Sequence, residues 1–144
     1  MEEREYPATI EEVYDVVKDN PSFVLDDEFK EFKMYDSDYY KLMQIAINKR
    51  PHLISEVDVK DKDFYEELIY LAIEKDIDVF ADIDDKYKTY DICITALKKD
   101  ISCIDSVPPV MIDEKMSLMV LNSKREDLYE FININKKDVV AKAQ

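Results

Sequence analysis

The sequence predicts an all-α fold, a short right-handed α-solenoid of about five repeats of roughly 25 residues, each a helix followed by a shorter helix. The main observation is a small apolar residue, termed the anchor, that recurs at spacings of 30, 26, 24 and 24 residues: Val16, Ala46, Ala72, Ala96 and Val120. The second is that the 144 residues include no glycine, which the tight hairpin turns of a β-rich protein would use. A compact bundle of the same hairpins and an irregular helical bundle are the alternative folds.

The repeats are predicted to form one domain over residues 1–144. Their approximate bounds are 8–35, which includes a longer capping unit, and then 36–61, 62–87, 88–111 and 112–135. Residues 136–144 begin like a further long helix, and we expect either a partial sixth repeat or cap, or a natural chain that continues. One such hairpin cannot bury its own apolar face, whereas stacked neighbours make a continuous core.

The first element of each copy is predicted to be an amphipathic helix of roughly three turns. One residue after the anchor stand Val17, Ile47, Ile73, Leu97 and Leu121, and four before it stand Glu12, Leu42, Leu68, Ile92 and Met116. These spacings place the side chains on one face of a helix. The candidate helix caps are Thr9, with Glu12 completing a capping box, and then Ser37, Thr89 and Asp113.

The second element is predicted to be a short helix packed back on the first. Its apolar positions fall eight and eleven residues after the anchor, one helical turn apart: Val24, Ile54, Phe80, Ile104 and Leu128, then Asp27, Val57, Ile83, Val107 and Phe131. Pro51 suits the first turn of such a helix, and Pro108 and Pro109 prevent another from continuing. In the first copy, residues 25–35 (LDDEFKEFKMY) predict an extra helical turn or a cap.

The charge of the chain favours a basic partner. Lys and Arg number 20 against 34 Asp and Glu, which gives a formal net charge of -14. This charge opposes direct binding to nucleic acid or to an anionic membrane surface. The negative charge attracts a basic protein, such as a nucleic-acid-binding protein, and it also favours solubility. The oligomeric state is left open by the sequence.

Several patterns predict a cytoplasmic protein, or one in the host-cell cytoplasm if the source is viral. The N-terminus MEEREYPATIEE is acidic and lacks the basic and apolar regions of a signal peptide. No apolar run approaches the roughly 18 residues that span a bilayer. Cys93 and Cys103 stand where other copies carry apolar residues, so we expect buried thiols rather than a disulfide framework.

The pattern Asp-x-x-(Ile/Leu)-x-x-x-Ala-(Ile/Leu)-x-Lys resembles a family of short tandem helical repeats of bacterial and viral proteins, known only as a domain of unknown function. The best matches are YDICITALKKDISCIDSVP at 90–108 and FYEELIYLAIEKDIDVFADID at 64–84, and the resemblance covers about residues 36–131. The chain lacks the glycine that the family usually has between the two elements, near Pro51, Ile77 and Ile101. The resemblance implies a repeat scaffold and no known activity.

Two sets of side chains are candidate partner contacts. The linkers between copies carry two groups of carboxylates about one repeat apart, which a regular stack would place along one edge: Asp58, Asp61 and Asp63, then Asp82, Asp84 and Asp85. Tyrosines lie near equivalent helix starts and would add aromatic contacts of the kind that dominate interfaces: Tyr39, Tyr65 and Tyr90. The alternatives are a solvated acidic edge and tyrosines that belong to the core.

No pattern of catalytic, cofactor-binding or metal-binding residues stands out. The Asp-rich stretches are 58–63 and 76–85, and loops that start at Asp76 or Asp82 fail the spacing of an EF-hand. One histidine, His52, with two cysteines cannot supply a zinc site. We therefore predict a non-catalytic protein-interaction module that binds a basic partner as an adaptor or inhibitor. The alternatives are a viral or phage-type DNA-mimic inhibitor of a nucleic-acid-binding or defence protein, and an accessory domain of an enzyme.

Overall fold

The computed structural model describes residues 7–132, which form helices and turns and contain no strand. The predicted all-α fold class is therefore confirmed. By its contacts the chain divides into two compact units, of which unit 1 ends at Val79 and unit 2 begins at Phe80. None of the helices in the described range combines the length and the apolar character that crossing a bilayer requires. The expected sixth repeat, residues 136–144, lies outside the described residues.

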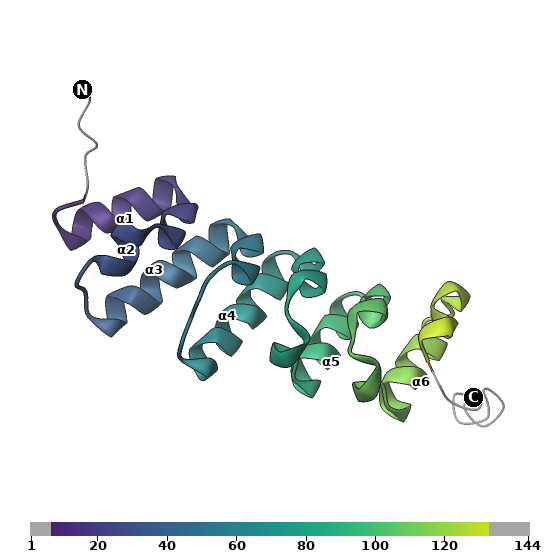
Figure 1. Ribbon diagram of the computed structural model, residues 1–144. Coiled ribbons are helices and arrows are strands. Elements are labelled where there is room, and N and C mark those ends of the chain that lie inside the picture. Colours follow the sequence, from purple (N-terminus) through teal and green to yellow (C-terminus); the bar gives the residue numbers. More distant parts are fainter. Residues whose placement is uncertain (1–6, 133–144) are drawn as a thin grey trace. The chain divides into compact units, whose positions relative to one another are not determined.

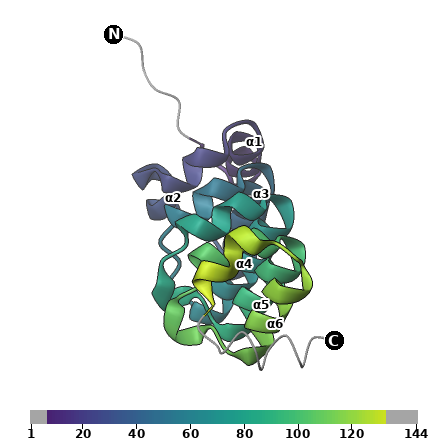
Figure 2. The same ribbon diagram turned by 90° about the vertical axis from the view of Figure 1, so that its right-hand side faces the viewer.

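In unit 1, long α-helices alternate with short 3-10 helices. In chain order the elements are α1 (Ile10–Asp19), η1 (Pro21–Leu25), α2 (Asp27–Glu31), α3 (Asp36–Lys49), η2 (Pro51–Ser55), α4 (Lys62–Lys75) and η3 (Ile77–Asp82), whose last residues belong to unit 2. Helix α3 contacts both α1 and α4, and α1 and α3 are neighbours in both Figure 1 and Figure 2. Figure 1 also shows the linker of residues 56–61 running back from η2 to the start of α4. Helix α2 is the extra helical turn predicted for the first copy.

Unit 2 repeats the same alternation. Its elements are η4 (Asp85–Tyr87), α5 (Tyr90–Lys99), η5 (Ile101–Ser106), η6 (Pro109–Met111), α6 (Glu114–Asn122) and η7 (Glu126–Phe131). Each long helix contacts the 3-10 helix that follows it, and η5 contacts η7. The short second element of each predicted copy is therefore a 3-10 helix, and η1, η2, η5 and η7 each contact the long helix that precedes them.

The predicted core positions are buried in both units. At the anchor the buried residues are Ala46, Ala72, Ala96 and Val120. Four residues before the anchor they are Leu42, Leu68, Ile92 and Met116. Eight residues after the anchor they are Val24, Ile54, Phe80, Ile104 and Leu128. Eleven residues after the anchor, Ile83 and Val107 are buried whereas Val57 and Phe131 are half-buried. The first copy differs, because Val16 is half-buried and the polar residues Glu12 and Asp27 are exposed. The apolar pattern thus located the core.

Helix caps explain where most of the long helices begin. The side chains of Thr9, Thr89 and Asp113 accept the backbone N–H groups of the residues three positions on, as predicted. The prediction for Ser37 is wrong, because α3 begins at Asp36 and Ser37 lies inside its first turn. There the helix start is supported by negative charge instead, since Asp36 and Asp38 lie at the positive end of the helix dipole.

The long helices end without glycine by a shared backbone geometry. The residue four after the anchor turns to extended φ values of -136 at Asn20, -135 at Arg50, -153 at Asp76 and -152 at Asp100. Its N–H still donates to the anchor carbonyl, at 2.7 Å in the first of these and 2.8 Å in the others. All these φ values are negative, so any L-residue other than proline can end the helix in this way.

The fifth copy departs from this rule and gives a first prediction. Lys124 occupies the equivalent position but has φ 61, a left-handed conformation that costs a residue with a Cβ roughly 1 kcal/mol. We expect Lys124→Gly to stabilise unit 2 by roughly 0.5–1 kcal/mol in thermal denaturation. Arg50→Gly is the matched control at a negative φ, and it should destabilise unit 1 by a similar amount because glycine gains freedom in the unfolded chain. A loss of stability in both variants would contradict the expectation.

Candidate functional site

The structure divides the predicted contact residues between the two units. Unit 1 contains Tyr39, Asp58, Asp61, Asp63 and Tyr65, and unit 2 contains Asp82, Asp84, Asp85 and Tyr90. The predicted acidic edge that would join the two groups stays a prediction. Within each unit, the contacts of the individual side chains separate those that hold the fold together from those that face a cleft.

Unit 1 has a cleft of about 490 Å³ that brings together Tyr39, Asp58 and Asp61. We call it the linker groove, because one wall is the linker of residues 56–61 and the other comes from η1, α2 and the first turns of α3. Its apolar lining includes the buried side chains of Val24, Phe29 and Met43. Its charged lining consists of Asp36, Asp58, Asp61, Lys30 and Lys60.

Aromatic rings stiffen the wall of the linker groove. The ring centroids of Tyr39 lie 6.1 Å from Phe29 and 6.0 Å from Tyr40, and Tyr40 lies 4.3 Å from Phe64. Phe29 and Phe64 are buried, whereas Tyr39 and Tyr40 are half-buried and line the cleft. A row of mutually packed rings loses little conformational freedom when a ligand binds, so this wall is preorganised.

The carboxylate of Asp61 is fixed in place by two hydrogen bonds. Its Oδ1 accepts the N–H of Phe64 at 3.1 Å, which caps α4, and its Oδ2 accepts the hydroxyl of Tyr40 at 3.3 Å. Burial and then the charge of Asp58 raise the pKa of Tyr39, and burial and then the charge of Asp61 raise the pKa of Tyr40. Both tyrosines therefore stay neutral at physiological pH, and both feel a negative potential from the linker.

The other predicted residues of unit 1 do not line the groove. Tyr65 is only 7% exposed, and its hydroxyl donates to the backbone oxygen of Ile54 at 2.8 Å. Tyr65 therefore belongs to the core, which was the alternative reading of the tyrosines. Asp63 is exposed in the first turn of α4 and is absent from the lining of the groove.

In unit 2, most of the predicted residues make contacts that support local structure. Asp84 accepts the N–H of Lys86 at 3.1 Å and caps η4, and Asp85 binds the ammonium group of Lys88 at 3.3 Å. The hydroxyl of Tyr90 donates to Asp113 at 2.6 Å, and Asp113 caps α6. Asp82 is exposed at the end of η3.

The Tyr90–Asp113 contact repeats the Tyr40–Asp61 contact of unit 1. In each case a tyrosine six residues before an anchor donates to the aspartate that caps the next long helix. Burial acts to raise the pKa of Asp113, but the hydrogen bonds from Tyr90 and the Met116 N–H outweigh it and lower that pKa. Sequence reasoning missed Tyr40 and the capping role of Asp61, although an aspartate just before an amphipathic helix is itself a capping signal.

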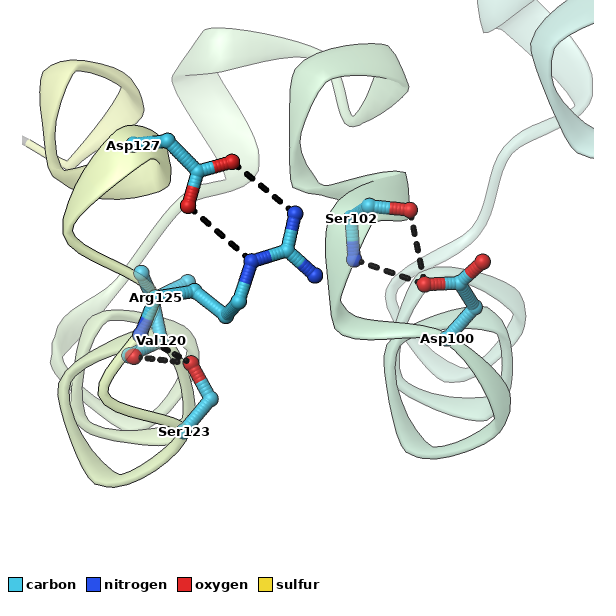
Figure 3. Close-up of polar contacts among 6 residues, drawn as sticks. All are labelled: Asp100, Ser102, Val120, Ser123, Arg125 and Asp127. Carbon is cyan, nitrogen blue, oxygen red and sulfur yellow. Dashed lines mark hydrogen bonds and ion pairs between the residues drawn. The ribbon is translucent and has the colours of Figure 1, made fainter.

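A polar cluster at the starts of η5 and η7 serves the short helices. Figure 3 shows Arg125 with its guanidinium against Asp127, at 3.0 and 2.9 Å, and Asp100 accepting both the N–H and the hydroxyl of Ser102. The hydrogen bonds from Ser102 lower the pKa of Asp100, and the hydrogen bond from Arg125 lowers that of Asp127. Asp100 thus caps the start of η5, whereas Asp127 lies inside η7 and holds the side chain of Arg125, the residue that precedes this helix, so both contacts have a structural role.

The described residues offer little for bond-making chemistry. Residues 7–132 contain no group of three His, Cys, Asp or Glu side chains that could hold a metal ion. Burial raises the pKa of Cys93 to about 11, which keeps its thiol protonated and poorly nucleophilic. Cys103 is half-buried, and His52 is exposed with Nε2 3.0 Å from Oδ2 of Asp76. The linker groove is therefore the better candidate site.

Comparison of the chain with protein-family models, with curated proteins and with solved structures finds no match. The resemblance to the tandem helical-repeat family thus stays a prediction.

Proposed function

We propose that the protein is a non-catalytic interaction module that binds a basic segment of a partner protein, as an adaptor or inhibitor, through the linker groove of unit 1. The single observation that carries the proposal is the groove itself, where Tyr39 and Tyr40 line an apolar floor beside Asp58 and Asp61. The partner is expected in the same compartment as the module, for which the sequence predicts the cytoplasm.

A lysine or arginine side chain matches this groove in both of its parts. Its aliphatic stem would cover Val24 and Met43, and its cationic head would lie near Asp58 and Asp61 and against a tyrosine ring. Three carboxylates and two ammonium groups line the groove, so its formal charge is -1 and attracts a cation. Asp61 and the packed aromatic rings are already held in place before binding. The groove therefore loses little conformational entropy when the complex forms.

We further propose that the paired helices are the repeats of a short α-solenoid. In unit 1 the pairs are α1 with η1 and α3 with η2, and in unit 2 they are α5 with η5 and α6 with η7; η3, which follows α4 along the chain, begins in unit 1 and ends in unit 2. The shared register of anchors, helix ends and buried positions supports this proposal, as does the resemblance to tandem helical repeats. Such arrays present an extended surface to a partner, in keeping with an interaction module.

The test compares carboxylates inside and outside the groove. The probe is a fluorescein-labelled peptide of alternating arginine and alanine, titrated with the full chain at physiological ionic strength and followed by fluorescence anisotropy. We expect Asp58→Asn and Asp61→Asn each to weaken binding roughly five- to tenfold, since a partly desolvated charge pair is worth about 1 kcal/mol. Asparagine caps a helix as well as aspartate does, so Asp61→Asn should keep α4 intact, which circular dichroism verifies.

Asp63→Asn is the matched control, because it removes the same charge two residues from Asp61 but outside the groove. Its affinity for the peptide should stay within about twofold of that of the unaltered chain. If all three variants weaken binding equally, the attraction is a general effect of the acidic surface and the groove is not the site. If the unaltered chain does not bind the peptide, the proposal fails as a whole.

A further inference from the structure

Unit 2 has a cleft of its own at the same register of the repeat. It has a volume of about 500 Å³, and one wall is the stretch after η5 that includes Val107, Pro108 and Ile112. Val107 stands eleven residues after the anchor Ala96, and Val57 of the linker groove stands eleven residues after the anchor Ala46. In both units the segment that follows a short helix therefore forms the wall of a cleft.

In this second cleft Lys88 neutralises one of three carboxylates and leaves the charges of Asp105, whose Oδ1 accepts the Ser106 hydroxyl at 3.0 Å, and of Glu130. Lys88 is 3% exposed, and its Nζ donates to the Ser106 oxygen at 2.7 Å and to Asp85 at 3.3 Å. The same Nζ lies 4.6 Å from the centre of the Phe80 ring. The charge of Lys88 is thus used inside the unit and offsets Asp85.

The two remaining acidic groups of the lining, Asp105 and Glu130, are exposed. They lie in a cleft whose apolar lining includes the buried Ile104 and Val107 and the half-buried Ile112 and Phe131. The charges of Lys88 and Asp85 cancel, so the lining has a formal charge of -2 beside an apolar surface. A cation with a long aliphatic stem complements both properties.

We infer that the unit 2 cleft binds a second basic side chain of the partner, an arginine, with its stem on Ile112 and Phe131 and its guanidinium at Glu130 and Asp105. The identity of the partner rests on the proposed function, whereas the cleft itself does not depend on the linker groove. The partner then carries at least two basic anchors, one for each unit.

The test uses a single arginine as the probe, so that each cleft is read out separately. N-acetyl-arginine methylamide is titrated into the uniformly 15N-labelled full chain, and backbone amide shifts are followed by NMR. We expect saturable shifts at Ser106, Ile112 and Phe131 in unit 2, and separately at Tyr40 and Asp58 in unit 1. N-acetyl-norleucine methylamide, which has an aliphatic side chain without the charge, should give no saturable shift at either place.

Glu130→Gln should weaken the unit 2 titration at least threefold and leave that of unit 1 unchanged. Glu126→Gln is the matched control, because Glu126 is an exposed glutamate of the same 3-10 helix outside the cleft lining.

Shifts in unit 1 without shifts in unit 2 would overturn this inference while the proposed function stands. Shifts in unit 2 without shifts in unit 1 would support the inference and refute the linker groove. An unchanged unit 2 titration in Glu130→Gln would also overturn it.

Discussion

Replacement of Ile54 by alanine should lower the free energy of unfolding of unit 1 by about 3 kcal/mol, the typical cost of truncating a fully buried isoleucine. Ile54 is 0% exposed and lies in η2, which contacts both α3 and α4. A 3-10 helix of five residues has few hydrogen bonds of its own and holds its shape through such packing. Loss of the side chain would therefore loosen the short helix and the two long ones that it joins.

Urea denaturation followed by circular dichroism would measure this loss. Val110→Ala is the control, because Val110 is 95% exposed and its truncation should change stability by less than about 0.5 kcal/mol. Equal effects of the two substitutions would show that η2 does not pack on the long helices. Ile104→Ala offers a parallel test in unit 2, since Ile104 is 1% exposed at the equivalent position of the repeat.

Tyr65→Phe should cost about 2 kcal/mol, although it removes one oxygen atom and leaves the ring in place. The Tyr65 hydroxyl donates to the backbone oxygen of Ile54 at 2.8 Å in a buried position. Without it, this carbonyl would lose its partner where water does not compensate, and an unsatisfied buried acceptor is more costly than the average hydrogen bond is favourable. The contact joins α4 to η2, so the loss would be felt by both elements.

Tyr35→Phe makes the same chemical change at a side chain that is 81% exposed, and its effect on stability should be close to zero. The pair of variants therefore separates the buried hydrogen bond from any general property of tyrosine. Tyr65→Phe should also leave affinity for the arginine peptide unchanged, because Tyr65 does not line the linker groove. If Tyr65→Phe instead lost much of its affinity and none of its stability, Tyr65 would be a contact of the binding surface and not a core residue.

Much of the fold could be predicted because the same apolar positions recur in several copies of the repeat. Agreement of the copies at the anchor and eight residues after it identified buried positions, such as Ala46 and Ile54, without any knowledge of the turns. The start of α3 was placed at Ser37 in error, because a serine near a helix start is a strong signal by itself and the side chain of Tyr35 gave none. The negative charges of Asp36 and Asp38 stabilise the start of α3 instead.

The candidate site could be predicted only in part. Asp58 and Asp61 were found because linker carboxylates are visible in a sequence, but Tyr40 and Phe29 enter the groove from other elements and require the tertiary fold. Tyr65 was misjudged for an avoidable reason. It stands seven residues before the anchor Ala72, and that spacing is two helical turns along the buried face of α4.

The helix ends at Asn20, Arg50, Asp76 and Asp100 give one position in each of the first four copies a backbone conformation that many residue types can adopt. Their backbone angles suit every L-amino acid other than proline, whose ring fixes φ and whose missing N–H could not reach the anchor carbonyl. A glycine-capped helix would confine the same position to one residue type. The side chains of Asp76 and Asp100 also accept the N–H groups of Asp78 and Ser102 in the next short helix. A library randomised at Asn20 and Arg50, with proline left out, should therefore fold throughout, and selection from it could give new specificities on an unchanged backbone.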